Sequence, residues 1–288
     1  MDYSIEAQQR VLEGLGKQYR TEYDSFPRNA ASAPPNGFFL DNGMFGSVDA
    51  ELLYAMVRKH KPARVVEVGA GWSTYLITEA LEKNAAQGHP SQHIVVDPVA
   101  PGFVYEIPGI ELIREKLQDT AVLADLRPGD FLVADTSHVF VPGHEIDLIL
   151  QTMEKLVGVW VHFHDMFLPE GYPEQWADRH YDEQEHVESF LLEHPEWQIV
   201  LAANYLHTQA SSLLSENIKS YAPARPIGPG SLWLRVEPPV AEIVADAFIG
   251  PVMEPEATHK FVSNRNGKQC LVPGCRKGPD NKVHREQA

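Results

Sequence analysis

Apolar and polar residues alternate in blocks along the middle of the chain, and the blocks have two different lengths. Short apolar runs predict seven strands, at 65–68, 93–97, 110–113, 130–135, 159–165, 197–204 and 231–237. The strand pattern is weaker in the third of these runs than in the others. Apolar residues at helical spacing predict helices between them: from Val48 to the HKPAR segment, then 73–84, 145–157 and 182–194. Apolar strands that alternate with helices are typical of an α/β fold, in which a mostly parallel sheet has helices on both faces.

The ends of the chain have a different pattern. Residues 1–45 combine a helix-like start with the polar, Pro-rich stretch NAASAPPNG, and they are compatible with either a lid or a homodimer contact. Residues 46–240 form the predicted α/β domain. The C-terminal extension 241–288 is polar and weakly periodic, so we expect it to be partly disordered. Its Cys270 and Cys275 lack the remaining ligands of a usual zinc site, which favours a mobile tail over a metal site.

Composition narrows the classes of partner. The 288 residues carry a formal net charge of −16, which argues against nucleic-acid and acidic-membrane partners because such a surface repels phosphates. The two cysteines cannot form a disulfide framework, and the sequence shows neither a signal peptide nor a transmembrane run. We therefore expect a cytoplasmic protein with a small-molecule partner.

Acidic residues stand at or near the ends of four predicted strands: Glu67, Asp97, Asp135 and Asp165. In open α/β sheets, ligands bind at the carboxyl ends of the strands. The stretch VVEVGAGWST places Gly69 and Gly71 in the turn between a strand and a helix, where glycine lets the backbone approach a ligand. The dinucleotide fingerprint requires a third glycine, and Thr74 occupies that position instead.

The two acidic residues near this turn indicate the kind of ligand. Glu67 suits a ligand that carries an ammonium group, and Asp97 is placed to accept two ribose hydroxyls. Nicotinamide and S-adenosylmethionine domains share the second feature, so Asp97 alone does not decide between them. A tight turn without any ligand is the alternative for this segment.

A series of motifs resembles the class I S-adenosylmethionine-dependent methyltransferases, and more narrowly the methyltransferase-24-type family. The matching segments, over about residues 45–236, are VVEVGAGWSTYL, IVVD, DFLVADTSHV, GHEID, VHFHDMFLPEGYP and GSLWLR. The resemblance implies a Rossmann-like, seven-stranded sheet whose last strand is antiparallel. It also implies S-adenosyl-L-methionine over the first two strand ends, in contact with Glu67, Gly69, Gly71, Ser73 and Asp97.

DTSH (135–138) and HFHD (162–165) follow two successive strands. If those strands are neighbours, Asp135, His138, His164 and Asp165 converge, and their oxygen and imidazole atoms suit a divalent metal. Histidine favours iron, manganese or zinc over magnesium. Without a metal, His138 or His164 is a candidate general base. The structural alternative is a loop cap at Asp135 and a hydrogen-bonded core group at His164, and His162 is expected to be structural.

The segments PEGYPEQW and RHYDEQEH come next. They are compatible with a substrate loop whose residues His180, Tyr181, Glu183 and Gln184 line a pocket. A solvated, acidic first helical turn is an equal alternative. Asp147 fits helix electrostatics better than catalysis.

The function that fits best is an S-adenosylmethionine-dependent methyltransferase that acts on a small molecule, at oxygen, with or without a divalent metal. The catalytic candidates are His138, His164 and Asp135. Two other hypotheses remain: a metal-dependent hydrolase or oxidase on the same fold, and a non-catalytic binding module.

Overall fold

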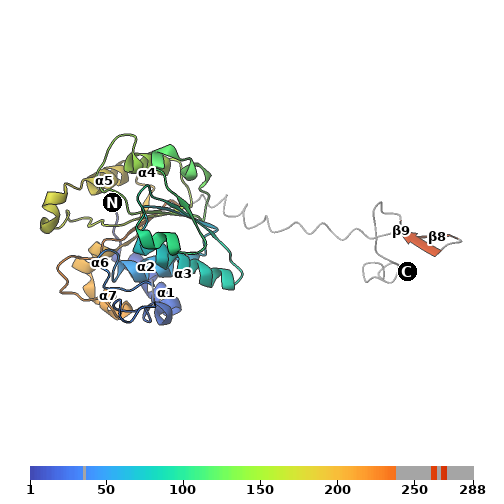
Figure 1. Ribbon diagram of the computed structural model, residues 1–288, viewed down its shortest axis with the longest axis horizontal. Helices are drawn as coiled ribbons and strands as arrows, with labels where there is room; N and C mark the ends of the chain where they lie inside the picture. The colour runs from blue at the N-terminus through green and yellow to red at the C-terminus, as the bar shows by residue number, and fades with distance from the viewer. Residues whose placement is uncertain (35–36, 238–260, 265–266, 271–288) are drawn as a thin grey trace. The chain divides into compact units, whose positions relative to one another are not determined.

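Seven strands form one sheet in the order β3-β2-β1-β4-β5-β7-β6 (Figure 1). Their bounds are β1 (Arg64–Val68), β2 (Gln92–Val96), β3 (Ile110–Ile113), β4 (Phe131–Ala134), β5 (Trp160–Phe163), β6 (Gln198–Ala202) and β7 (Leu232–Arg235). All pairings are parallel except those of β7, which is antiparallel to both β5 and β6. The predicted Rossmann-like fold with seven strands and helices on both faces is confirmed.

This computed structural model describes residues 1–34, 37–237, 261–264 and 267–270. The chain divides into two units, Met1–Pro238 and Pro239–Ala288. In the second unit, β8 (Phe261–Asn264) pairs with β9 (Gly267–Cys270) in an antiparallel hairpin. Most of the C-terminal extension, including Cys275, lies outside the described residues. The expected partial disorder of this extension therefore stays a prediction.

Successive strand residues enter two different cores, because side chains alternate between the faces of a sheet. Val65 and Phe131 pack into one core, together with α1 (Ile5–Tyr23), α2 (Asp49–His60), α3 (Trp72–Ala86) and α7 (Ser211–Asn217). Val66 and Leu132 pack into the other, with α4 (Glu145–Met153) and α5 (Glu183–Glu193). Each face of the sheet is therefore covered by helices (Figure 1).

Two short helices were not expected from the sequence. The predicted strand 197–204 ends at Ala202, and α6 (Ala203–Gln209) begins directly after it, followed by α7. The Ala203 N–H donates to the carbonyl of Ser231, the residue that precedes β7, at 2.8 Å. The predicted helix 145–157 also ends early, at Met153.

The N-terminal helix α1 is part of the α/β body. Leu12 and Leu15 are buried in the core, and the Tyr23 hydroxyl donates to the carbonyl of Asn217 at 3.0 Å. The side chain of Gln8 accepts a hydrogen bond from the backbone of Ala202 at the end of β6. A lid or homodimer role for residues 1–45 stays a prediction.

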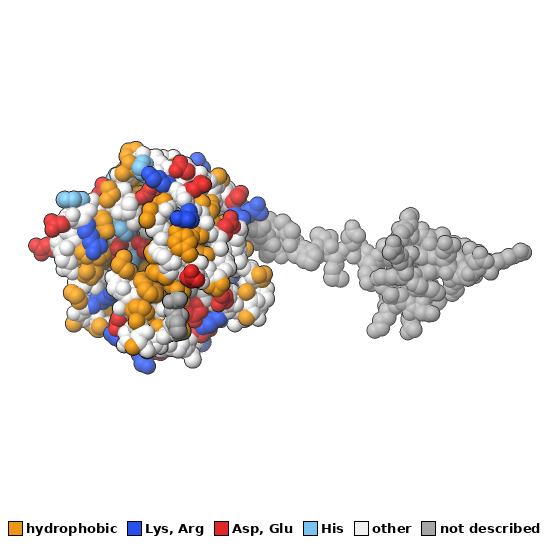
Figure 2. Space-filling view, in the orientation of Figure 1, with side chains coloured by type: hydrophobic (Ala, Val, Ile, Leu, Met, Phe, Trp, Pro, Cys, Tyr) orange, Lys and Arg blue, Asp and Glu red, His pale blue; other side chains and the backbone are white. Residues whose placement is uncertain are grey.

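Two surface properties bear on partners. Among the described residues, no helix combines the length and the apolar character needed to cross a bilayer. On the face drawn in Figure 2, Lys and Arg side chains are scattered among Asp and Glu side chains.

Candidate active site

Two adjacent strands end side by side and deliver the polar residues of the site. β4 and β5 pair in parallel, with Ala134 opposite Phe163, the last residue of each strand. The His164 N–H then donates to the carbonyl of Ala134 at 3.0 Å. Asp135 and His164 therefore leave the sheet together at its carboxyl edge, where such sheets bind ligands. β1 is the other neighbour of β4, so the glycine turn lies at the same edge.

The four predicted metal-site residues meet at this edge. The Nε2 atom of His138 lies 3.4 Å from a carboxylate oxygen of Asp135 and 3.7 Å from one of Asp165. The Nδ1 atom of His164 lies 3.3 Å and 3.6 Å from the same two carboxylates. Ligand atoms of Asp135, His138 and Asp165 all lie within 4.8 Å of one another, whereas His164 is outside that group. The spacing of the three suits one ion after small side-chain adjustments.

Two of these residues have a left-handed backbone. His138 has φ +59° and Asp165 has φ +56°, a conformation that costs free energy in residues other than glycine. Gly230 packs directly against Asp165, and a Cβ atom there would lie 2.8 Å from the Cα of Asp165. Surrounding structure thus holds the chain in a conformation that aims both side chains at the cluster.

Glu183 fixes the orientation of His138. Its carboxylate lies 2.7 Å from Nδ1 of His138, which leaves Nε2 facing Asp135 and Asp165. The backbone N–H groups of Asp182 and Glu183 also donate to the His138 carbonyl, at 3.0 and 3.2 Å. A carboxylate behind an imidazole is the usual arrangement around a metal-binding histidine.

Asp49, the first residue of α2, is a site residue that the sequence analysis missed. Its carboxylate is buried, accepts hydrogen bonds from the backbone of Gly230 and Ser231, and lies 3.7 Å from Nε2 of His164. The sequence offered only an acidic residue in the first turn of a helix, which helix electrostatics alone explains.

Burial and charge together shift the pKa values of the cluster. Burial lowers the pKa of His138, but Asp135 and Glu183 outweigh it and raise that pKa to about 10. Burial raises the pKa of Asp135, and the two imidazoles outweigh it, so this carboxyl ionises well below its usual range. The pKa of Asp165 is raised, mainly by burial, because His164 offsets only part of that effect.

His164 is also biased toward its charged form. Burial lowers the pKa of this imidazole, but Asp135 and Asp165 raise it well above its usual value. The ring packs on Phe45, with centroids 4.4 Å apart. His162, one pleat deeper, is fully buried beside Ser231 at 3.0 Å, and burial lowers its pKa to about 3. The structure therefore places His162 in the core as a neutral side chain.

The glycine-turn cavity, of about 500 Å³, opens beside β1 and β2. Its lining residues come from the ends of β1, β2 and β4, and include Val68, Gly69, Val96, Asp97, Pro98, Asp135, Thr136 and Ser137. The carboxylate of Asp97 accepts hydrogen bonds from the backbone of Ala70 at 2.9 Å and Val99 at 2.7 Å. Asp97 is therefore held rigidly on the wall of this cavity.

The two glycines of the turn differ in what surrounds them. Gly69 has φ +88°, and a Cβ atom there would lie 1.8 Å from the carbonyl oxygen of Asp135. Protein packing by itself therefore requires glycine at 69. Gly71 has extended backbone, and a Cβ atom there would meet no protein atom within 4 Å. Its neighbourhood is open, although Gly71 is not among the residues that line the glycine-turn cavity.

Glu67 and Ser73 lie beneath the turn and are not among the residues that line the glycine-turn cavity. Glu67 is fully buried, where it accepts a hydrogen bond from the Ser73 hydroxyl at 2.6 Å and lies 3.0 Å from Nε2 of His93. The structure thus directs the Glu67 carboxylate to protein partners that support the turn.

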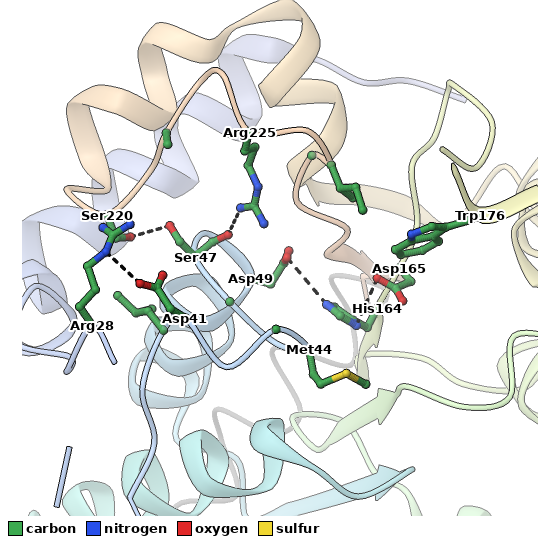
Figure 3. Close-up of a pocket in the computed structure, with 16 residues that line it drawn as sticks. Arg28, Asp41, Met44, Ser47, Asp49, His164, Asp165, Trp176, Ser220 and Arg225 are labelled. Carbon is green, nitrogen blue, oxygen red and sulfur yellow. Dashed lines mark hydrogen bonds and ion pairs between the residues drawn. The ribbon is translucent and has the colours of Figure 1, made fainter. Parts of the chain in front are cut away.

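A second cavity, of about 440 Å³, is lined by His164 and Asp165 of the cluster (Figure 3). We call it the Arg225 cavity. Its lining includes Arg28, Asp41, Met44, Ser47, Asp49, His164, Asp165, Trp176, Ser220 and Arg225. Asp135 lines the glycine-turn cavity, whereas His164 and Asp165 line the Arg225 cavity. The cluster therefore contributes lining residues to both cavities.

The segment after β5 does not supply the predicted pocket lining, because neither cavity is lined by His180, Tyr181, Glu183 or Gln184. Glu183 and Gln184 are buried, so they do not form a solvated helical turn. The ring of Tyr181 lies 4.7 Å from that of His138, whereas His180 is exposed. Trp176, in the preceding 3-10 helix, lines the Arg225 cavity.

Comparisons with known proteins return structures only. No family model matches the chain, and no curated protein matches it. One similar structure is an O-methyltransferase from Bacillus cereus in complex with SAH, with TM-score 0.41, 10% identity, and coverage of 80% of this chain and 91% of that chain. Another is CmcI with Mg-SAM, with TM-score 0.38, 15% identity, and coverage of 69% and 82%. An apo structure of CmcI has TM-score 0.41, 14% identity, and coverage of 76% and 84%. At these values, the likenesses do not define a cofactor or substrate for this chain.

Proposed function

We propose that this protein is an S-adenosylmethionine-dependent methyltransferase that acts on a hydroxyl group of a small molecule. One observation carries the proposal: residues of one cluster of carboxylates and imidazoles line two cavities, of about 500 and 440 Å³. A group transfer needs two ligands held with their reacting atoms adjacent, and this arrangement supplies a place for each. As part of the same proposal, the protein is a member of the methyltransferase-24-type family and is located in the cytoplasm.

The methyl donor fits the glycine-turn cavity. Asp97 presents its carboxylate at the wall, where it can accept hydrogen bonds from ribose hydroxyls, and the space beside Gly71 admits a ligand at the start of α3. Glu67 supports the turn from below through Ser73 rather than by lining this cavity. The acceptor then fits the Arg225 cavity, with its hydroxyl toward Asp165 and His164.

The cluster also fits a divalent cation. Four buried or partly buried carboxylates surround only two imidazoles: Asp49, Asp135, Asp165 and Glu183. Even with both imidazoles charged, an excess of negative charge remains, and buried charge without compensation is costly. In the described part of the chain, the Nδ1 atom of His164 makes ion-pair contacts with Asp135 and Asp165 but no well-aligned hydrogen bond, and one oxygen of Glu183 is buried without a hydrogen-bond partner. Asp135, His138 and Asp165 would hold the ion.

A bound cation would lower the pKa of an acceptor hydroxyl and help to orient its oxygen toward the methyl group. The chain's own residues prepare that step. Glu183 holds His138 with Nε2 toward the site, and Asp49 and Gly230 hold the loops from which His164 and Asp165 project. Burial of the cluster limits the access of water, which strengthens electrostatic interactions there.

A general base without a metal is less well supported. The pKa of His138 is raised to about 10 and that of His164 is raised well above its usual value. In the cluster as it stands, the surrounding carboxylates favour the protonated form of both imidazoles. A group that already carries its proton cannot accept one from the acceptor.

Calorimetry on the full chain tests the proposal. S-adenosylmethionine is titrated into protein stripped with a chelator and into protein loaded with Mn²⁺, and Mn²⁺ uptake is measured separately. We expect the donor to bind in both states and Mn²⁺ to bind the stripped protein. Donor binding without Mn²⁺ uptake would remove the cation and keep the methyltransferase. Mn²⁺ uptake without donor binding would overturn the methyltransferase in favour of a metal-dependent hydrolase or oxidase.

A further inference from the structure

Arg225 is a cation with spare hydrogen-bonding capacity inside the cavity assigned to the acceptor. One of its guanidinium nitrogens donates to the carbonyl of Ser47, and the structure records no ion pair for Arg225 among the described residues. A guanidinium carries five N–H donors, so most of them remain available. Figure 3 shows this side chain reaching from its loop into the space above Asp49.

The loop that carries Arg225 is fixed to the reaction centre. Gly228 packs so closely on Asn204 that a Cβ atom would lie 2.6 Å from its side-chain oxygen. Two residues further on, the Gly230 N–H donates to Asp49, the residue next to His164. The position of Arg225 relative to the cluster is therefore set before any ligand binds, which favours selective recognition.

Two large apolar side chains line the same cavity. The ring of Trp176 is held by Phe167, edge to face at 5.2 Å, and by the Arg179 guanidinium at 4.2 Å. Met44 is 77% exposed at the cavity wall (Figure 3). A rigid aromatic ring and a flexible thioether suit a flat apolar ligand body.

We propose that the acceptor is a hydroxy acid with a flat apolar body, whose carboxylate binds Arg225 while its hydroxyl lies at Asp165 and His164. The role of the hydroxyl as methyl acceptor rests on the proposed function, whereas binding of the carboxylate by Arg225 does not. A guanidinium binds a carboxylate through two parallel hydrogen bonds. Asp41, Asp49 and Asp165 also line the cavity, so a doubly charged phosphate is repelled more strongly than a carboxylate.

Binding of matched acids and amides to the full chain tests the carboxylate site without requiring methyl transfer. The probes are para-hydroxybenzoate and para-hydroxycinnamate, each compared with its neutral amide by calorimetry, with neither donor nor metal added. We expect the wild type to bind at least one acid roughly 10–100-fold more tightly than its amide. Arg225→Gln removes that preference, and Arg225→Lys keeps part of it because the charge remains.

Arg10→Gln is the matched control, because Arg10 is an exposed arginine on α1 that lines neither of the two cavities. We expect its acid preference to change less than about threefold. The inference is overturned if neither acid binds the wild type, if acids and amides bind equally, or if Arg225→Gln keeps the preference. If the preference for acids over amides depends on Arg225 but S-adenosylmethionine does not bind, the carboxylate site is supported and the proposed methyltransferase function is contradicted.

Discussion

The Nδ1 atom of His164 lies 3.3 Å from the carboxylate of Asp135, and the two side chains line different cavities. The contact exists because β4 and β5 are neighbours that end at the same level. It joins a residue that lines the space assigned to the donor to a residue that lines the space assigned to the acceptor. Methyl transfer between two bound molecules needs such a junction, since the reacting atoms must come into contact.

Replacing Glu183 by glutamine tests the cation site without removing a ligand. Glutamine keeps the size of the side chain but loses the charge that orients His138 through Nδ1. We expect Mn²⁺ affinity to fall roughly 10–100-fold, as for other residues that orient a metal-binding imidazole. The measurement is calorimetry with metal-stripped protein.

The matched control is Glu185→Gln, an exposed glutamate in the same turn of α5. Its Mn²⁺ affinity should equal that of the wild type. An equal loss in both variants would point to general electrostatics and would contradict a specific role for Glu183.

The two glycines of the turn should respond differently to alanine. Gly69→Ala places a Cβ atom against the carbonyl of Asp135 at a residue with φ +88°, so we expect a loss of several kcal/mol of stability. Gly71→Ala meets no protein atom within 4 Å, so stability should change by less than about 1 kcal/mol. Urea denaturation measures both changes.

Donor binding separates the two effects further. If a ligand approaches Gly71, the well-folded Gly71→Ala variant should bind S-adenosylmethionine at least about tenfold more weakly, because a methyl group occupies the approach. Wild-type affinity in this variant would show that the donor lies elsewhere.

Glu51 provides a pH dependence that does not involve the proposed cation. Burial raises its pKa from 4.5 to about 7, although Ser220 and Arg225 oppose the shift. Between these pH values the folded chain keeps a proton that the unfolded chain loses, so the free energy of unfolding falls as pH rises. The full effect is at most about 3 kcal/mol.

Glutamine at 51 cannot titrate, so the stability of Glu51→Gln relative to the wild type should grow between pH 5 and pH 8. Denaturation at both pH values measures this difference. Glu6→Gln, at an exposed site in the first turn of α1, should show no such growth. The same relative stability of Glu51→Gln at both pH values would count against a raised pKa.

Tertiary contacts explain where the sequence-based expectations fell short. Glu67 shares a sheet face with Val65, and that face is covered by α3, so its carboxylate meets Ser73 and His93 under the turn. The helices α6 and α7 were missed because the apolar run before them continues the strand pattern of β6. Neither outcome is encoded in the local spacing of apolar residues.

The seven strands, and the edge of the sheet where the polar site residues lie, could be predicted from the sequence. Apolar period and length are local properties, and strands that run in parallel bring Asp97, Asp135 and Asp165 to one edge whatever the loops do. The sequence did not show that Asp49 and Arg225 lie beside the cluster, or that residues of the cluster line two cavities; the three-dimensional packing sets both. These residues come from segments far apart in the chain, and packing between helices and loops, rather than any local pattern, sets where they meet.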